Sequence, residues 1–91
     1  MVRYRAVAKG RVQGVGFRAY AAKIARDHRL TGWVANLSSG DVEMEVQGER
    51  QKVELFLALL YKGNGWMEIE SLHTEKVSRC DGEERFLVRH G

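Results

Sequence analysis

Gly10-Arg11-Val12-Gln13-Gly14-Val15-Gly16-Phe17-Arg18 is the stretch that decides how this chain folds and what it can bind. It follows a short apolar segment and runs directly into an alanine-rich one, so it predicts a glycine-rich loop between a strand and a helix. Glycines at 14 and 16 can adopt backbone conformations that a β-carbon disfavours, and successive N–H groups can then turn inward around an anion. The helix start adds unpaired N–H groups and the positive end of its dipole, and Arg18 adds a planar cation. The stretch therefore predicts a phosphate-binding loop.

Other glycine-rich motifs fit this loop less well. It is not a nucleotide-binding P-loop, because no Gly-Lys-Ser/Thr closes it, and it lacks the third glycine of a dinucleotide-binding fingerprint. The run from Gly14 to Phe17 superficially resembles the signature of the RNA-recognition motif. That signature needs aromatic side chains exposed on a strand, whereas Phe17 opens a helix and should pack inward. The alternative is that the two glycines only allow the chain to turn between the strand and the helix and have no role in binding.

Hydrophobic periodicity outward from the loop predicts a β-α-β-β-α-β order with a short extra strand. Apolar residues alternate along the predicted strands and recur every three to four residues along the predicted helices. The strands are Val2 to Ala8, Leu30 to Asn36, Val42 to Gln47, Met67 to about Val77 and Arg85 to Arg89, and the helices are Ala19 to His28 and about Glu49 to Lys62. Leu37 to Gly40 is predicted to be the turn between the second and third strands.

This order brings the loop and Asn36 together. A β-α-β crossover makes the first two strands parallel, and the third strand can lie between them in antiparallel sense. Gly10 and Asn36 then lie at the same edge of the sheet, about 10 Å apart across two strand spacings. Asparagine is also common in turns, so a purely structural role for Asn36 is the alternative.

Three motifs taken together resemble the acylphosphatase family. The loop from Gly10 to Arg18 is followed by Gly32-Trp33-Val34-Ala35-Asn36 and then by Gly40-Asp41-Val42-Glu43, and the similarity extends over essentially the whole chain. The resemblance implies an α+β fold, a ferredoxin-like α/β sandwich whose mostly antiparallel sheet is covered on one face by two helices. It implies a single acylphosphatase-like domain over residues 1–91 that hydrolyses the carboxyl-phosphate anhydride of small acyl phosphates, with no cofactor and no metal. The chain departs from the family pattern after the second helix, where Gly63-Asn64-Gly65-Trp66 stands without proline.

An acyl phosphate makes few demands on its catalyst, because a carboxylate, whose conjugate acid has a pKa of about 4, departs at neutral pH without a general acid. Arg18 would hold two phosphoryl oxygens, and the other contacts would come from backbone N–H groups of Val12, Gln13, Gly14, Val15, Gly16 and Phe17. Asn36 would orient the attacking water through its carbonyl oxygen. An amide is a poor proton acceptor, so we expect a phosphoryl oxygen or the departing carboxylate to take the proton. No covalent intermediate is expected.

Composition limits the remaining possibilities. The 91 residues are 44% hydrophobic and 30% charged, which is typical of one globular domain. The longest apolar run, Leu55 to Tyr61, is too short to cross a membrane, the N-terminus lacks the apolar core of a signal peptide, and Cys80 is the single cysteine. We therefore expect a cytoplasmic monomer that acts on a small molecule, without membrane or nucleic-acid partners.

The net charge is +3, and Arg3, Arg5, Lys9, Arg11 and Arg18 lie in the first fifth of the chain. This asymmetry would suit steering of a small anion.

Two alternatives from other protein classes stay open. The same fold serves in regulatory or RNA-binding modules, and an acylphosphatase-like domain also occurs fused within large hydrogenase-maturation carbamoyltransferases. His28, His73 and His90 have no partner arrangement typical of a nucleophile, so structural roles are predicted for them, with His90 in the tail. The acidic pairs Glu43/Glu45 and Glu68/Glu70 are interpreted as solvated strand faces, in preference to a metal site or a glycosidase dyad.

Overall fold

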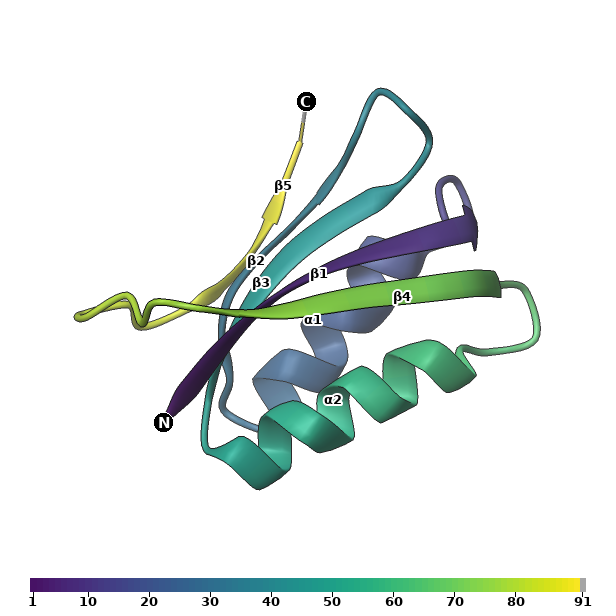
Figure 1. Cartoon of the computed structure of the whole chain (residues 1–91). Helices are drawn as coiled ribbons and strands as arrows, with labels where there is room; N and C mark the ends of the chain where they lie inside the picture. Colours follow the sequence, from purple (N-terminus) through teal and green to yellow (C-terminus); the bar gives the residue numbers. More distant parts are fainter. Residues whose placement is uncertain (91) are drawn as a thin grey trace.

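A computed structural model describes residues 1–90 and contains the predicted elements in the predicted order (Figure 1). The strands are β1 (Val2–Arg11), β2 (Thr31–Asn36), β3 (Val42–Gly48), β4 (Glu68–Val77) and β5 (Phe86–Arg89), and the helices are α1 (Phe17–Asp27) and α2 (Arg50–Lys62). No helix among these residues is long and apolar enough to cross a membrane.

The five strands form one mixed sheet in the order β4-β1-β3-β2-β5. As predicted, β3 lies between β1 and β2 and is antiparallel to both, so β1 and β2 point in the same direction. The short β5 pairs with β2 in parallel, from Gly32 opposite Phe86 to Ala35 opposite Arg89. Three strands therefore run the same way and end at one edge of the sheet.

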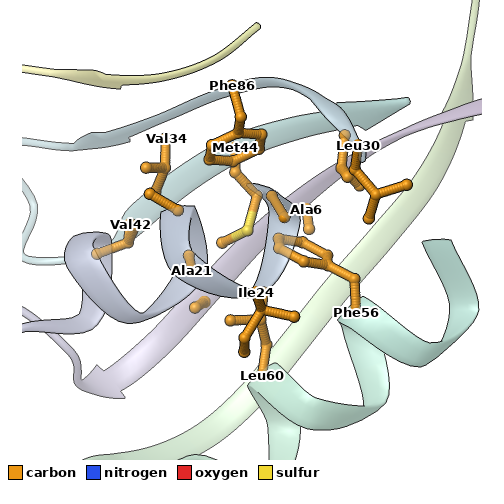
Figure 2. Close-up of a cluster of buried hydrophobic side chains, with 14 of the residues drawn as sticks. Ala6, Ala21, Ile24, Leu30, Val34, Val42, Met44, Phe56, Leu60 and Phe86 are labelled. Atoms are coloured by element: carbon orange, nitrogen blue, oxygen red, sulfur yellow. The ribbon is translucent and has the colours of Figure 1, made fainter. Parts of the chain in front are cut away.

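Both helices pack on one face of this sheet, as expected for the predicted ferredoxin-like α+β fold (Figure 1). Figure 2 shows the core between the two layers, where Met44 of β3 and Phe86 of β5 lie among side chains of both helices. Met44, Phe56 and Leu60 have no exposed surface, and the rings of Phe56 and Phe86 pack in a tilted arrangement with their centroids 6.0 Å apart. This dense packing makes the strand ends a rigid support for the loops that follow them.

Some boundaries differ from the predicted ones because of contacts distant in sequence. β1 continues to Arg11 because β4 pairs with it as far as Glu68, with a register shift between Lys9 and Gly10. α1 begins at Phe17, two residues earlier than predicted, because Gly16 is already the N-cap. β4 begins at Glu68, one residue later than the predicted Met67, and Trp66 lies in the turn before it and is 79% exposed.

The open face of the sheet carries ion pairs in place of a second layer. Arg3 is only 4% exposed, because its guanidinium binds Glu45 and Glu83 at 2.7 Å each. Burial alone would raise the pKa of the Glu83 carboxyl, but hydrogen bonds from Arg3 and Thr31 and the charge of Arg3 lower it below its usual value.

Further ion pairs join Arg5 to Glu43 and Lys9 to Asp41. Three of the five basic residues in the first fifth of the chain, Arg3, Arg5 and Lys9, are thus paired with carboxylates.

Candidate active site

A cleft of about 250 Å³ lies where β1, β2 and β5 end and α1 begins. It is lined by Val12, Gly14, Gly16, Phe17, Arg18, Ala19, Asn36, Val88 and His90. The topology therefore brings the loop and Asn36 together, as predicted from the strand order. Of the predicted site residues, Gln13 and Val15 do not line the cleft.

The two glycines in the middle of the loop have the backbone conformation that the sequence predicts for them. Gly14 and Gly16 have φ values of 73° and 80°, in the left-handed region that favours glycine. A β-carbon at either position would meet nothing within 4 Å, so the torsion angle is the reason for glycine there and crowding is not.

Several N–H groups of the loop and helix start face no protein acceptor. The first intrahelical bond runs from the Tyr20 N–H to the Gly16 carbonyl, and no side chain caps the helix. Within residues 1–90, the N–H groups of residues 13–16 have no hydrogen-bond acceptor in the protein. These donors and the helix dipole favour an anion at the same place.

Buried contacts hold the loop on both sides. The side chains of Val12 and Phe17 are 2% and 1% exposed, so they anchor the loop in the core as expected for Phe17. The Gln13 amide donates hydrogen bonds of 2.7 Å and 2.8 Å to the carbonyls of Leu37 and Asp41 in the β2–β3 turn. Gln13 thus ties the loop to the turn that follows Asn36.

Arg18 lies in the first turn of α1, where a cation is unfavourable for the helix dipole. Its Nη1 donates a 2.6 Å hydrogen bond to the carbonyl of Arg89 at the end of β5. This bond orients the guanidinium at the cleft and leaves its other N–H donors for an anion.

Asn36 ends β2, and its side chain makes no hydrogen bond within the described residues. Its Oδ1 is buried without a protein partner, the single side-chain atom of which this is true in that part of the chain. Such orphan acceptors are rare and require an explanation. In this cleft, Oδ1 is available to accept a hydrogen bond from a water or a ligand.

Three lining residues, Ala19, Val88 and His90, were not predicted as site residues. His90 follows β5 and lies in the cleft because β5 pairs with β2. A four-residue strand has no sequence signal that specifies its partner, so the pattern could not place His90 at the site.

A larger hollow of about 480 Å³ lies at the other end of α1, between Arg26, Arg29 and Arg85. Arg26 there donates to the Phe86 carbonyl at 2.9 Å, and cations suit the C-terminal end of a helix. None of the predicted site residues lines this hollow. Elsewhere in residues 1–90, no three His, Cys, Asp or Glu side chains gather where they could hold a metal ion.

Comparison with known proteins gives consistent matches. The sequence model of the acylphosphatase family matches residues 4–88. An acylphosphatase of Clostridium beijerinckii is 41% identical over 90 residues, which cover 99% of this chain and 100% of the relative. The crystal structure of acylphosphatase from Bacillus subtilis superimposes with a TM-score of 0.93 at 30% identity, covering 99% of this chain and 100% of that one. An acylphosphatase structure from Coxiella burnetii gives 0.91 at 35% identity, covering 97% and 92%.

Proposed function

The chain belongs to the acylphosphatase family and is a hydrolase of acid anhydrides; we propose that Arg18 and the loop hold the phosphoryl group of its acyl phosphate substrate while Asn36 orients the attacking water. The substrate is a small acyl phosphate, which the enzyme splits into a carboxylate and inorganic phosphate. The chain acts as a monomer in the cytoplasm and needs no cofactor.

The phosphoryl group is bound by fixed donors. The loop N–H groups without protein acceptors surround one side of the anion, and the free N–H groups of Arg18 form a fork that matches two phosphoryl oxygens. A cleft of about 250 Å³ is small compared with typical ligand pockets of about 300–1,000 Å³. The phosphoryl group therefore occupies it and the acyl group extends outward.

The observation that carries the proposal is the orphan Oδ1 of Asn36 beside this anion seat. A module that only binds anions would use the loop and Arg18, but it would have no use for an acceptor, which repels a phosphoryl oxygen. A water molecule between Oδ1 and phosphorus satisfies the acceptor and presents its oxygen lone pair to the phosphoryl group. The carboxylate then leaves on the far side without an acid.

Release of phosphate from acetyl phosphate or benzoyl phosphate, with a chelator present, tests the proposal. Arg18→Ala should reduce kcat/KM by about 10²–10³-fold, the usual effect of losing a preorganised charge contact. Arg26→Ala is the matched control, because Arg26 is also on α1 and also donates to a carbonyl of β5. A folded wild type without activity, or equal losses in the two variants, would contradict the proposal.

A further inference from the structure

The larger hollow at the C-terminal end of α1 has an excess of positive charge. Its volume of about 480 Å³ lies within the range of about 300–1,000 Å³ that is typical of sites for small organic ligands. Three arginines and one glutamate line it, which are Arg26, Arg29, Arg85 and Glu84. Because guanidinium groups stay protonated at all physiological pH values, this hollow attracts small anions.

Two of these arginines have no partner in the described part of the chain. Arg26 donates to the Phe86 carbonyl at 2.9 Å, so its guanidinium already has a structural role. Within residues 1–90, the guanidinium groups of Arg29 and Arg85 make neither a hydrogen bond to a protein acceptor nor an ion pair, although Glu84 lines the same hollow. Their donors are therefore available to a ligand.

Arg29 is held at the hollow in an unfavourable backbone conformation. Its φ of 56° is in the left-handed region, and it is the single non-glycine residue with a positive φ in residues 1–90. The Arg29 N–H donates to the Arg26 carbonyl at 3.2 Å, and the Leu30 N–H donates to the Ala25 carbonyl at 2.8 Å, so this conformation is fixed. Glycine is the usual residue at such a position after a helix, and strained residues cluster at binding and catalytic sites. The strain thus indicates a use for the Arg29 side chain.

Arg85 comes from a different segment, the stretch before β5. Its carbonyl accepts a 2.9 Å hydrogen bond from the Gly32 N–H of β2, so its backbone is fixed as well. Fixed backbones lower the cost of binding, because only side-chain freedom is lost. The hollow also has apolar surface, since Leu87 lines it and is 47% exposed.

We propose that this hollow binds a small organic phosphate, whose phosphate group contacts Arg29 and Arg85 and whose apolar part packs against Leu87. Guanidinium groups bind phosphate through paired hydrogen bonds, and the two positive charges in excess match the charge of a phosphate monoester near neutral pH. The site is separate from the cleft, because Arg18 and Arg26 are eight residues apart on α1, about 12 Å along the helix axis. The inference does not depend on the proposed function.

The test is a titration with phenyl phosphate at pH 7.5, followed by NMR of the backbone amides. It uses the Arg18→Ala variant, so that binding at the cleft is weakened and the hollow is observed by itself. The amides of residues 29–30 and 85–87 should shift to saturation. Benzoate has the same ring and one negative charge, so its Kd should be at least about tenfold higher.

Arg29→Gly and Arg85→Gln, each introduced into the Arg18→Ala variant, should raise the Kd for phenyl phosphate about tenfold or more, because each removes charge-assisted hydrogen bonds. Arg79→Gln is the matched control, because Arg79 is also exposed in the segment between β4 and β5 but does not line the hollow. Glycine relieves the left-handed strain at position 29, so Arg29→Gly should stay folded and its loss of binding would not reflect unfolding.

The absence of saturable shifts at residues 29–30 and 85–87 would overturn the inference, and so would shifts that occur in wild type but vanish in Arg18→Ala, since they would place the phosphate at the cleft. An equal effect of Arg79→Gln would overturn it by indicating attraction to net charge alone, and equal Kd values for benzoate and phenyl phosphate would exclude a phosphate site. Because the readout is binding, an inactive wild type would overturn only the proposed function.

Discussion

Asn36→Ala should remove activity without weakening the fold. The Asn36 side chain makes no hydrogen bond in the described part of the chain, and its buried Oδ1 lacks a protein partner. The side chain forms no hydrogen bond to another protein group, so its removal affects only the packing around a smaller side chain. We expect the free energy of unfolding to stay within about 1 kcal/mol of wild type.

The matched variant is Gln13→Ala, which removes the other amide beside the cleft. The Gln13 amide donates two hydrogen bonds of 2.7 Å and 2.8 Å. Their loss should reduce the free energy of unfolding by about 1–3 kcal/mol and leave the carbonyls of Leu37 and Asp41 with fewer partners. For a domain of this size, 1 kcal/mol corresponds to a shift in Tm of roughly 4–8 °C, which thermal unfolding resolves.

Activity should show the opposite order. Without Asn36 the water is no longer held in line with the departing oxygen, and misplaced reactants lose about 10²-fold or more in rate. Urea unfolding of both variants and phosphate release from acetyl phosphate give the two quantities. The reasoning is refuted if Asn36→Ala keeps more than a third of wild-type kcat/KM, or if it loses more than about 2 kcal/mol of stability.

Three further predictions concern Arg18, Arg29 and Glu83. Arg18→Lys keeps the charge but loses the planar fork, so KM should rise about tenfold or more, as measured by initial rates; an unchanged KM would show that charge alone is sufficient. Arg29 has a left-handed φ of 56° directly after α1, a conformation that favours glycine. Arg29→Gly should therefore raise the free energy of unfolding by about 0.5–1 kcal/mol, whereas Arg29→Ala should not. Equal urea midpoints for the two variants would contradict this. The folded state lowers the pKa of Glu83, so the ionised carboxylate stabilises the fold above the unfolded pKa, and this stabilisation disappears as pH falls below about 4.5. Between pH 7 and pH 3.5, the free energy of unfolding measured in urea should therefore decrease less for Glu83→Gln than for wild type.

Most of the fold could be predicted because its signals are local. Strand alternation and helical periodicity are read within a few residues, and the handedness of the crossover then places β3 between β1 and β2. Contacts between distant residues left no such signal. Arg3 looked like a surface cation available for steering, yet its partners Glu45 and Glu83 are 42 and 80 residues away, and only the assembled sheet brings them together.

The residues of the candidate site also divide into those with a local sequence signal and those placed by contacts between distant segments. Gly14, Gly16 and Arg18 belong to one contiguous motif, and Asn36 ends a strand whose neighbour could be inferred, so these residues could be predicted to converge. His90 could not be placed, because its position depends on the pairing of β5 with β2, which four residues do not specify.

The location of the cleft follows from strand direction. β1, β2 and β5 are mutually parallel, so their carboxyl ends meet at one edge, where open α/β sheets generally bind ligands. Each end supplies one part of the proposed site: β1 leads to the loop proposed to bind the anion, β2 ends in Asn36, proposed to hold the water, and β5 ends in Arg89, whose carbonyl accepts the hydrogen bond from Arg18. The three parts lie outside the packed core, whereas the core positions the strands that carry them. A substitution of Asn36 should therefore change the reaction while the folded core persists, which is why activity and stability can be separated at this site.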